Sequence, residues 1–163
     1  MNTADDTVTR VSSIAERAHA PSVSPDGTRL AYTAARDEGF QIMVQDVASG
    51  AMNTLTAVPD GATRPTWSPD GTRLLYTRLP PDGAFVEVRD LASGGVTPIT
   101  IDGYAWTAEA AWSPDGRWIA IAATRQRADV EDWDLFVVPA IPNGVAWRLT
   151  EGRANDRAPS WSR

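Results

Sequence analysis

The chain has 163 residues, the length of one ordinary domain, and 42% of them are hydrophobic and 22% charged. This balance excludes a disordered protein, and the absence of cysteine excludes disulfides and thiolate metal sites. The net charge is −6 and the basic residues are scattered singly, which argues against a nucleic-acid partner.

The first segment, residues 1–7, is polar and acidic, and we expect it to be disordered. It has neither the basic region nor the apolar region of a secretory signal, so we expect a cytoplasmic protein. No apolar run approaches the ~20 residues of a membrane span, so we expect no membrane partner. Residues 8–12 resemble the last strand of a repeat unit and open the predicted folded region, 8–163.

The tetrapeptide Ser-Pro-Asp-Gly returns at near-constant spacing. It occupies residues 24–27, 68–71 and 113–116, so its serines lie 44 (68 − 24) and 45 (113 − 68) residues apart. Proline presets φ at the second position of a turn, Ser and Asp bond nearby backbone, and Gly suits the exit. We therefore interpret each copy as the turn of a β-hairpin.

The rest of each unit repeats as well. A second turn leads into a third strand, and an Asp-Val-Ala-Ser-Gly turn or its near copy precedes a short fourth strand. Four strands in about 45 residues indicate one propeller blade, whereas no stretch sustains the apolar period of a helical repeat. The units span residues 21–57, 65–101 and 110–150, and residues 158–163 start a further blade.

The prediction is an all-β fold, a partial β-propeller. It has about three complete four-stranded antiparallel blades plus single strands of the flanking blades. A tryptophan precedes the later turns, at positions 67, 112 and 161. We interpret these indoles as wedges packed between blades; the alternative is a platform on which a ligand stacks.

Residues 67–77, Trp-Ser-Pro-Asp-Gly-Thr-Arg-Leu-Leu-Tyr-Thr, together with the Asp-Leu-Ala-Ser-Gly turn, resemble the repeat of TolB-type β-propellers. The same repeat builds the amino-terminal propeller of prolyl oligopeptidase-family serine peptidases, where it sits over the hydrolase domain and filters substrates by size. The resemblance covers essentially the whole chain from about residue 8. It has departures: Val23 replaces the first Trp, residues 139–144 replace an Asp-containing turn, and Arg163 stands where the fourth copy needs Pro.

No catalytic machinery is evident in the sequence. The Gly-x-Ser-x-Gly motif of α/β-hydrolases is missing, and the one histidine, His19, is expected to be a solvated loop residue. An acidic cluster lies in the second turn of the third unit: Asp129, Glu131, Asp132 and Asp134. It could hold Ca²⁺, but the calcium-loop pattern is absent, which favours a solvated acidic loop. We expect no cofactor and no metal.

Candidate partner-facing residues lie on the face formed by the second turns and the fourth-to-first strand connections, where loops vary on a fixed scaffold. The candidates are Tyr104, Trp106, Glu109, Arg153 and Asp156, and Arg64, Asn155 and Arg157 share the face. Tyr104 with Trp106 is the strongest pair, because loop aromatics are costly unless covered. Packing beneath the loop is the alternative for both rings.

These observations leave two main hypotheses for function. The first is the non-catalytic, substrate-gating propeller of a cytoplasmic prolyl oligopeptidase-like serine peptidase, whose triad lies in an α/β-hydrolase domain downstream of Arg163. The second is a TolB-like scaffold with no enzyme attached, which binds a protein or peptide; a sensor propeller is a third. The strand count predicts the amino-terminal part of a longer protein, so the isolated chain should self-associate through exposed blade faces.

Overall fold

A computed structural model describes residues 17–37, 39–125, 132–142, 144–151 and 155–162. Within these ranges it holds twelve strands, arranged as three four-stranded antiparallel sheets in which neighbours in sequence are neighbours in space. No helix among the described residues is long and apolar enough to cross a membrane. The all-β prediction of three blades is confirmed.

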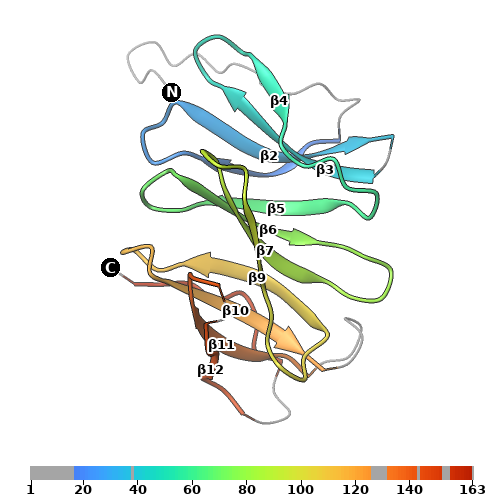
Figure 1. The fold of residues 1–163 in the computed structure, drawn as a ribbon, viewed down its shortest axis with the longest axis vertical. Helices are drawn as coiled ribbons and strands as arrows, with labels where there is room; N and C mark the ends of the chain where they lie inside the picture. Colours follow the sequence, from blue (N-terminus) through green and yellow to red (C-terminus); the bar gives the residue numbers. More distant parts are fainter. Residues whose placement is uncertain (1–16, 38, 126–131, 143, 152–154, 163) are drawn as a thin grey trace.

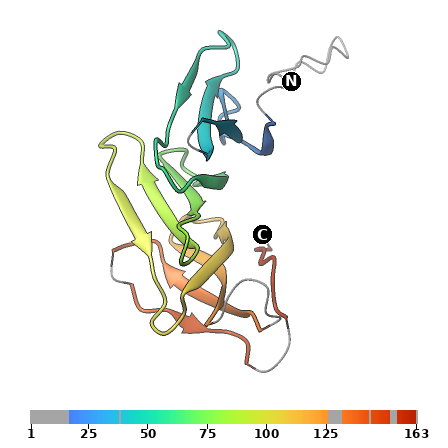
Figure 2. The ribbon, with the colours of Figure 1, turned by 90° about the vertical axis from the view of Figure 1, so that its right-hand side faces the viewer.

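The three sheets correspond to the three predicted units. The first contains β1 (His19–Val23), β2 (Arg29–Arg36), β3 (Gly39–Asp46) and β4 (Met52–Thr54). The second contains β5 (Ala62–Trp67), β6 (Arg73–Arg78), β7 (Phe85–Asp90) and β8 (Val96–Ile99). The third contains β9 (Trp106–Trp112), β10 (Trp118–Thr124), β11 (Asp134–Pro139) and β12 (Trp147–Arg148). Figure 1 shows the sheets stacked in chain order, and Figure 2 shows that they follow one another along a curve.

At the end of the chain the structure differs from the prediction, and at its start the prediction falls on residues that the structure does not describe. Residues 1–7 and the strand expected at 8–12 lie outside the described residues. The strand expected at 159–162 is not formed: these residues make no strand pairing. The inner strand of a blade is held by its hydrogen bonds to the second strand of the same blade. In the described structure no second strand lies beside residues 159–162, so they form no strand.

The Ser-Pro-Asp-Gly turns form as expected. In the first copy the Gly27 N–H donates to the Ser24 carbonyl at 2.8 Å, and the Arg29 N–H donates to Ser24 Oγ at 2.9 Å. Gly27 has φ of +72°, a conformation that glycine adopts without steric cost. Each turn therefore closes a hairpin between the first and second strands of its blade, with the polar groups of the motif satisfied locally.

The hydrophobic core lies between the sheets. Leu75, Val86 and Val88 of the second blade form one buried cluster with Trp112 and Ile119 of the third. Both faces of the middle strands are therefore covered, which explains their continuous apolar runs. The blades hold together mainly through these side chains, and one isolated backbone bridge, in which the Thr107 N–H donates to Ala84 O at 2.7 Å, also joins the second and third blades.

The tryptophan wedges are confirmed and have a hydrogen-bonding partner in the preceding blade. Trp67 and Trp112 are buried, and their indole N–H groups donate to the carbonyls of Ser22 (3.0 Å) and Thr66 (3.2 Å). Trp161 donates to Ala111 O at 3.0 Å. The fourth copy thus keeps the wedge contact although its strand is not formed.

Two of these tryptophan rings are each covered by an arginine of the preceding blade. Arg29 lies 4.4 Å above the Trp67 ring and donates to Gly71 O, and Arg73 lies 4.7 Å above Trp112 and donates to Gly116 O. We call this pair of contacts the arginine clamp. In the third blade Trp118 takes the corresponding position and packs edge-on against Trp147, with ring centroids 5.2 Å apart.

Candidate functional site

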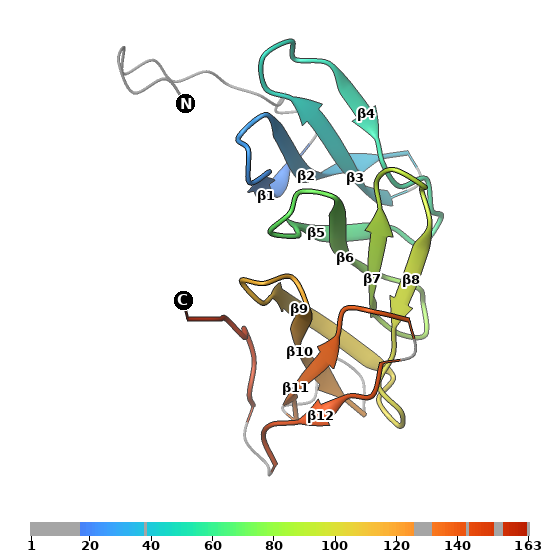
Figure 3. The same ribbon diagram turned by 60° about the vertical axis from the view of Figure 1, so that its left-hand side comes forward.

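The first strand of each blade lies on the inner side of the curve, as β1, β5 and β9 do in Figure 3. These inner strands share a backbone irregularity four residues before each turn serine. Ala20, Arg64, Glu109 and Ala158 have positive φ values of 50–56°, and the pairing register of β1, β5 and β9 shifts nearby. Because the positive φ recurs at the equivalent position of all four copies and two of these residues are alanine, it belongs to the repeat architecture and is not specific to one side chain.

At two of these bulges the side chains are charged and they meet. The Glu109 Oε1 atom accepts from Arg157 Nη2 at 2.6 Å and from Arg64 Nη1 at 3.4 Å. Its Oε2 atom accepts from the Ala158 N–H at 2.9 Å. We call Arg64, Glu109 and Arg157 the inner-strand cluster. It joins β5, β9 and the segment of residues 155–162.

The cluster has a net charge of +1, because two arginines surround one glutamate. The side chain of Glu109 is 18% exposed, whereas those of Arg64 and Arg157 are 55% and 37% exposed. Partial burial opposes the charged form of Glu109, but the hydrogen bonds from Ala158 and Arg157 and both guanidinium charges hold its pKa below the ordinary value. Among the described residues, no other carboxylate forms an ion pair with either arginine.

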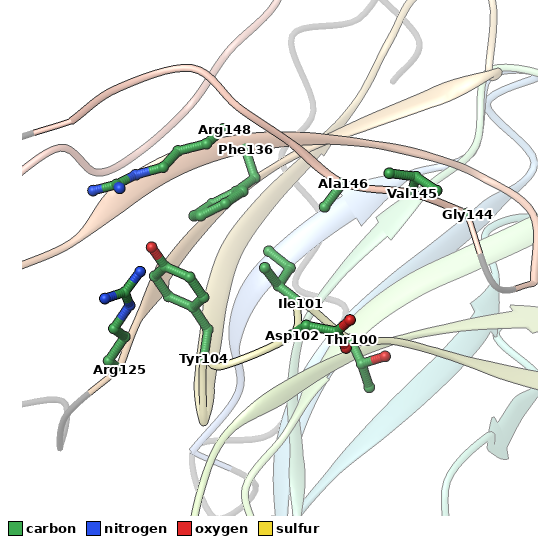
Figure 4. Close-up of a pocket in the computed structure, with 10 residues that line it drawn as sticks. All are labelled: Thr100, Ile101, Asp102, Tyr104, Arg125, Phe136, Gly144, Val145, Ala146 and Arg148. Carbon is green, nitrogen blue, oxygen red and sulfur yellow. The ribbon is translucent and has the colours of Figure 1, made fainter.

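A second group of polar residues lines a cavity of about 490 Å³ in the third blade. The Tyr104 hydroxyl donates to Asp134 Oδ2 at 3.3 Å, and Arg125 lies 4.9 Å from the Tyr104 ring centroid. Arg148 pairs with Asp134 at 2.7 Å, and this contact raises the pKa of Arg148. Figure 4 shows Tyr104, Arg125 and Arg148 gathered at one end of the cavity, with Asp102 and Thr100 farther along.

The structure places two of the five predicted partner-facing residues in these two sites, and the others lie elsewhere or outside the described residues. Glu109 joins the inner-strand cluster, whereas Tyr104 lines the cavity and packs edge-on against Phe136, with ring centroids 4.8 Å apart. Trp106 is not a loop residue: it begins β9 and pairs with Thr124 of β10. Asp156 uses its backbone N–H to bond Trp133 O at 2.9 Å.

Arg153 lies outside the described residues. Asn155 is exposed, while Arg64 and Arg157 contact Glu109 as described above. The predicted face therefore holds one connected group of charges and a separate aromatic residue.

The remaining candidates from the sequence find other surroundings. His19 lies in β1, not in a loop; its Nε2 atom is 3.4 Å from Thr63 Oγ1, and its ring packs on Phe40. Asp129 and Glu131 lie outside the described residues, and Asp134 is buried between Tyr104 and Arg148. Among the residues described, no group of three or more acidic or histidine side chains is placed to hold a metal ion.

Sequence reasoning missed the arginine clamp and the basic side of the cavity. Arg29 and Arg73 follow the same Ser-Pro-Asp-Gly-Thr pentapeptide in two units, a repetition that could have marked them. Arg125 and Arg148 were missed because they meet Tyr104 and Asp134, residues from other segments that only the folded blade brings beside them.

Comparisons with known proteins identify the repeat. A family model described as the TolB beta propeller domain matches residues 1–134. The chain is similar to the structure of a putative TolB from Agrobacterium tumefaciens, with 22% identity and a TM-score of 0.68 over 78% of this chain and 47% of that one. No curated protein matches.

Two solved enzymes contain a similar arrangement. Acylaminoacyl peptidase from Pyrococcus horikoshii is 18% identical, with a TM-score of 0.56 over 82% of this chain and 25% of that one. Oligogalacturonate lyase from Vibrio parahaemolyticus is 12% identical, with a TM-score of 0.65 over 85% of this chain and 43% of that one. The chain thus spans less than half the length of each of these three structures, and at these identities the likeness shows the fold alone.

Proposed function

The chain belongs to the TolB β-propeller family, and on that premise we propose that it is the non-catalytic propeller portion of a prolyl oligopeptidase-like serine peptidase. In this proposal the protein works in the cytoplasm. The propeller admits peptides past its inner strands to an α/β-hydrolase domain elsewhere in the protein. Its role is to select substrates, and the hydrolase domain supplies the chemistry.

The observation that carries this proposal is the inner-strand cluster. Its two arginines lie on β5 and in the 155–162 segment and expose their charge to solvent. Charged, exposed groups on a rigid scaffold suit recognition, because the backbone beneath them is already fixed. Peptides carry the charged ends and side chains that such groups recognise.

The described residues hold no serine–histidine pair of their own. The triad of a prolyl oligopeptidase-like peptidase needs a histidine base within hydrogen-bonding reach of its serine. The ring nitrogens of His19 contact Arg17 O and Thr63 Oγ1, each at 3.3–3.4 Å. No serine hydroxyl contacts His19 in the described part of the chain.

A TolB-like interaction scaffold with no enzyme attached is the second candidate, and the cavity beside Tyr104 favours it. That cavity is lined by aromatic, aliphatic, polar and arginine side chains from β11, β12 and their loops and from the connection between the second and third blades. Such a mixture of side chains suits the binding of a protein segment that inserts one side chain into the cavity. The two candidates differ in whether the complete protein carries a reactive serine.

The test is active-site labelling of the complete gene product with a fluorophosphonate probe, combined with hydrolysis of acyl-peptide coumarin amides of increasing length. We expect one labelled serine and a sharp loss of hydrolysis for the longer peptides. A complete product that neither reacts with the probe nor cleaves any peptide, and that captures a defined protein partner, would establish the scaffold instead.

A further inference from the structure

We propose that Arg64 and Arg157 form a binding site for a peptide carboxylate on the inner side of the propeller, with Glu109 as the residue that positions both guanidinium groups. The choice of a peptide as the source of the carboxylate rests on the proposed function. The site itself rests on the contacts of the inner-strand cluster.

The first step is the number of donors available. A guanidinium group has five N–H donors in a planar fork that matches a carboxylate. Within the described residues, the guanidinium of Arg64 makes one contact, 3.4 Å to Glu109. That of Arg157 contacts Glu109 at 2.6 Å and lies 4.6 Å from the Trp133 ring centroid. One internal carboxylate thus serves two arginines, whose side chains remain 55% and 37% exposed to solvent.

The second step is the role of Glu109. Its carboxylate is largely covered, and both oxygens accept hydrogen bonds, from Arg64 and Arg157 at one and from the Ala158 N–H at the other. It is therefore committed to the protein and remains charged, which fixes where the two guanidinium groups lie. Arginines held in place lose less side-chain entropy on binding.

The third step is accessibility in the complete protein. The faces of a blade are covered where a neighbouring blade packs on them, as Trp112 and Ile119 of the third blade are covered by the second. The inner strands instead border the central channel of a propeller. Figure 3 shows β5 and β9 on that inner side, with the 155–162 segment beyond β9, so further blades leave the cluster open to the channel.

The fourth step is charge. The whole chain has a net charge of −6, so acidic ligands are repelled except where a local positive site holds them. A single carboxylate between two arginines matches the excess positive charge of the cluster. The ligand is therefore a peptide presenting one carboxylate here, either its C-terminal group or an Asp or Glu side chain.

The experiment measures binding to the complete gene product by fluorescence anisotropy, with any reactive serine blocked beforehand by a fluorophosphonate. The probes are tetra-alanine with an uncharged BODIPY label and a free C-terminal carboxylate, its C-terminal amide, and the amide with Asp at the third position. We expect the free acid to bind about tenfold more tightly than the amide, as two charge-assisted hydrogen bonds allow. The Asp peptide shows whether a side-chain carboxylate substitutes for the terminal one.

Arg64→Gln and Arg157→Gln should each abolish the preference for the acid, while Arg117→Gln, which removes an exposed arginine from the third turn, should leave it intact. Arg64→Gln carries the test alone if loss of Arg157 loosens the 155–162 segment. Equal affinity for acid and amide, or an unchanged preference in Arg64→Gln, would overturn the site. Tighter binding of trigalacturonate than of either peptide would overturn the peptide assignment.

The two proposals fail separately. Fluorophosphonate labelling without any preference for the acid refutes the carboxylate site and leaves the peptidase. A preference for the acid without labelling refutes the peptidase and leaves the site.

Discussion

At the scale of single residues, local hydrogen bonds hold the aspartates of the repeated turns in the ionised form although these residues are exposed. The Ser68 hydroxyl donates to Asp70 Oδ1, and the N–H and hydroxyl of Thr72 donate to the same atom. The hydrogen bond from the serine is the main cause that lowers the pKa of Asp70 to about 2, and Asp26 has the same environment and the same pKa. Each turn is therefore built around an ionised side chain.

This arrangement predicts a loss of stability in acid. Because the pKa of these aspartates is lower in the folded state than the ordinary 3.8, their contribution is present above about pH 4 and is lost as the pH falls toward 2. We expect the urea midpoint of the protein to fall in that window. Asp70→Asn should lower the midpoint at pH 6 and weaken its acid dependence.

Asp82→Asn, at an exposed turn aspartate outside the motif, is the control and should keep the wild-type pH profile. An Asp70→Asn protein whose midpoint follows the wild-type curve from pH 6 to pH 2 would show that the turn carboxylates do not contribute.

The turns were predictable from sequence because every group that forms them lies within six consecutive residues. The bulge that organises the inner-strand cluster was not, since Ala20, Arg64, Glu109 and Ala158 share no side-chain property. Alignment of the repeats places Arg64 and Glu109 at equivalent positions, but their contact depends on two inner strands lying side by side. That neighbourhood is a property of packed blades and has no local signature.

At the scale of elements, the joint between consecutive blades combines a wedge from one with a clamp from the other. Trp112 inserts its ring and bonds Thr66 O, while Arg73 covers the ring and donates to Gly116 O and Ala140 O. Arg29 does the same at the preceding joint with one carbonyl, Gly71 O. The strand order was predictable from the turns. The clamp was not, because its hydrogen bonds join residues 42 to 67 positions apart that only packed blades bring together.

Substitution of the clamp tests its contribution. Arg73→Lys keeps the charge but cannot cover the indole and reach two carbonyls at once, so we expect a loss of about 1–2 kcal/mol in the free energy of unfolding. Arg29→Lys should cost less, because it gives up one carbonyl contact instead of two. Urea denaturation at pH 7 measures both.

Arg117→Lys, at an exposed arginine beside the third turn, is the matched control and should unfold like the wild type. The clamp would have no energetic role if Arg73→Lys and Arg117→Lys had the same midpoint.

At the scale of the whole molecule, the three blades bury their mutual faces but leave apolar side chains open on the third. Val145, Trp147 and Leu149 are 70%, 50% and 60% exposed, and they alternate along the outermost strand and its flanks, so they share one face. Trp118 packs against Trp147 where the other blades carry a clamp arginine. This surface resembles the buried faces of the first two joints in its composition.

We therefore predict that the 163-residue chain, produced by itself, self-associates through the third blade. Sedimentation velocity should show a weight-average mass that rises with concentration, because contiguous exposed apolar surface is removed from water on association. Trp147→Glu with Leu149→Glu should shift the chain toward monomer. Val47→Glu with Met52→Glu places the same added charge on exposed apolar residues of the first blade, so it separates the loss of this patch from general charge repulsion. If both double variants dissociate equally, or the wild type stays monomeric at every concentration, the third blade is not the interface. In that case the aromatic partner of Trp147 is Trp118 of the same blade and not a second copy of the chain.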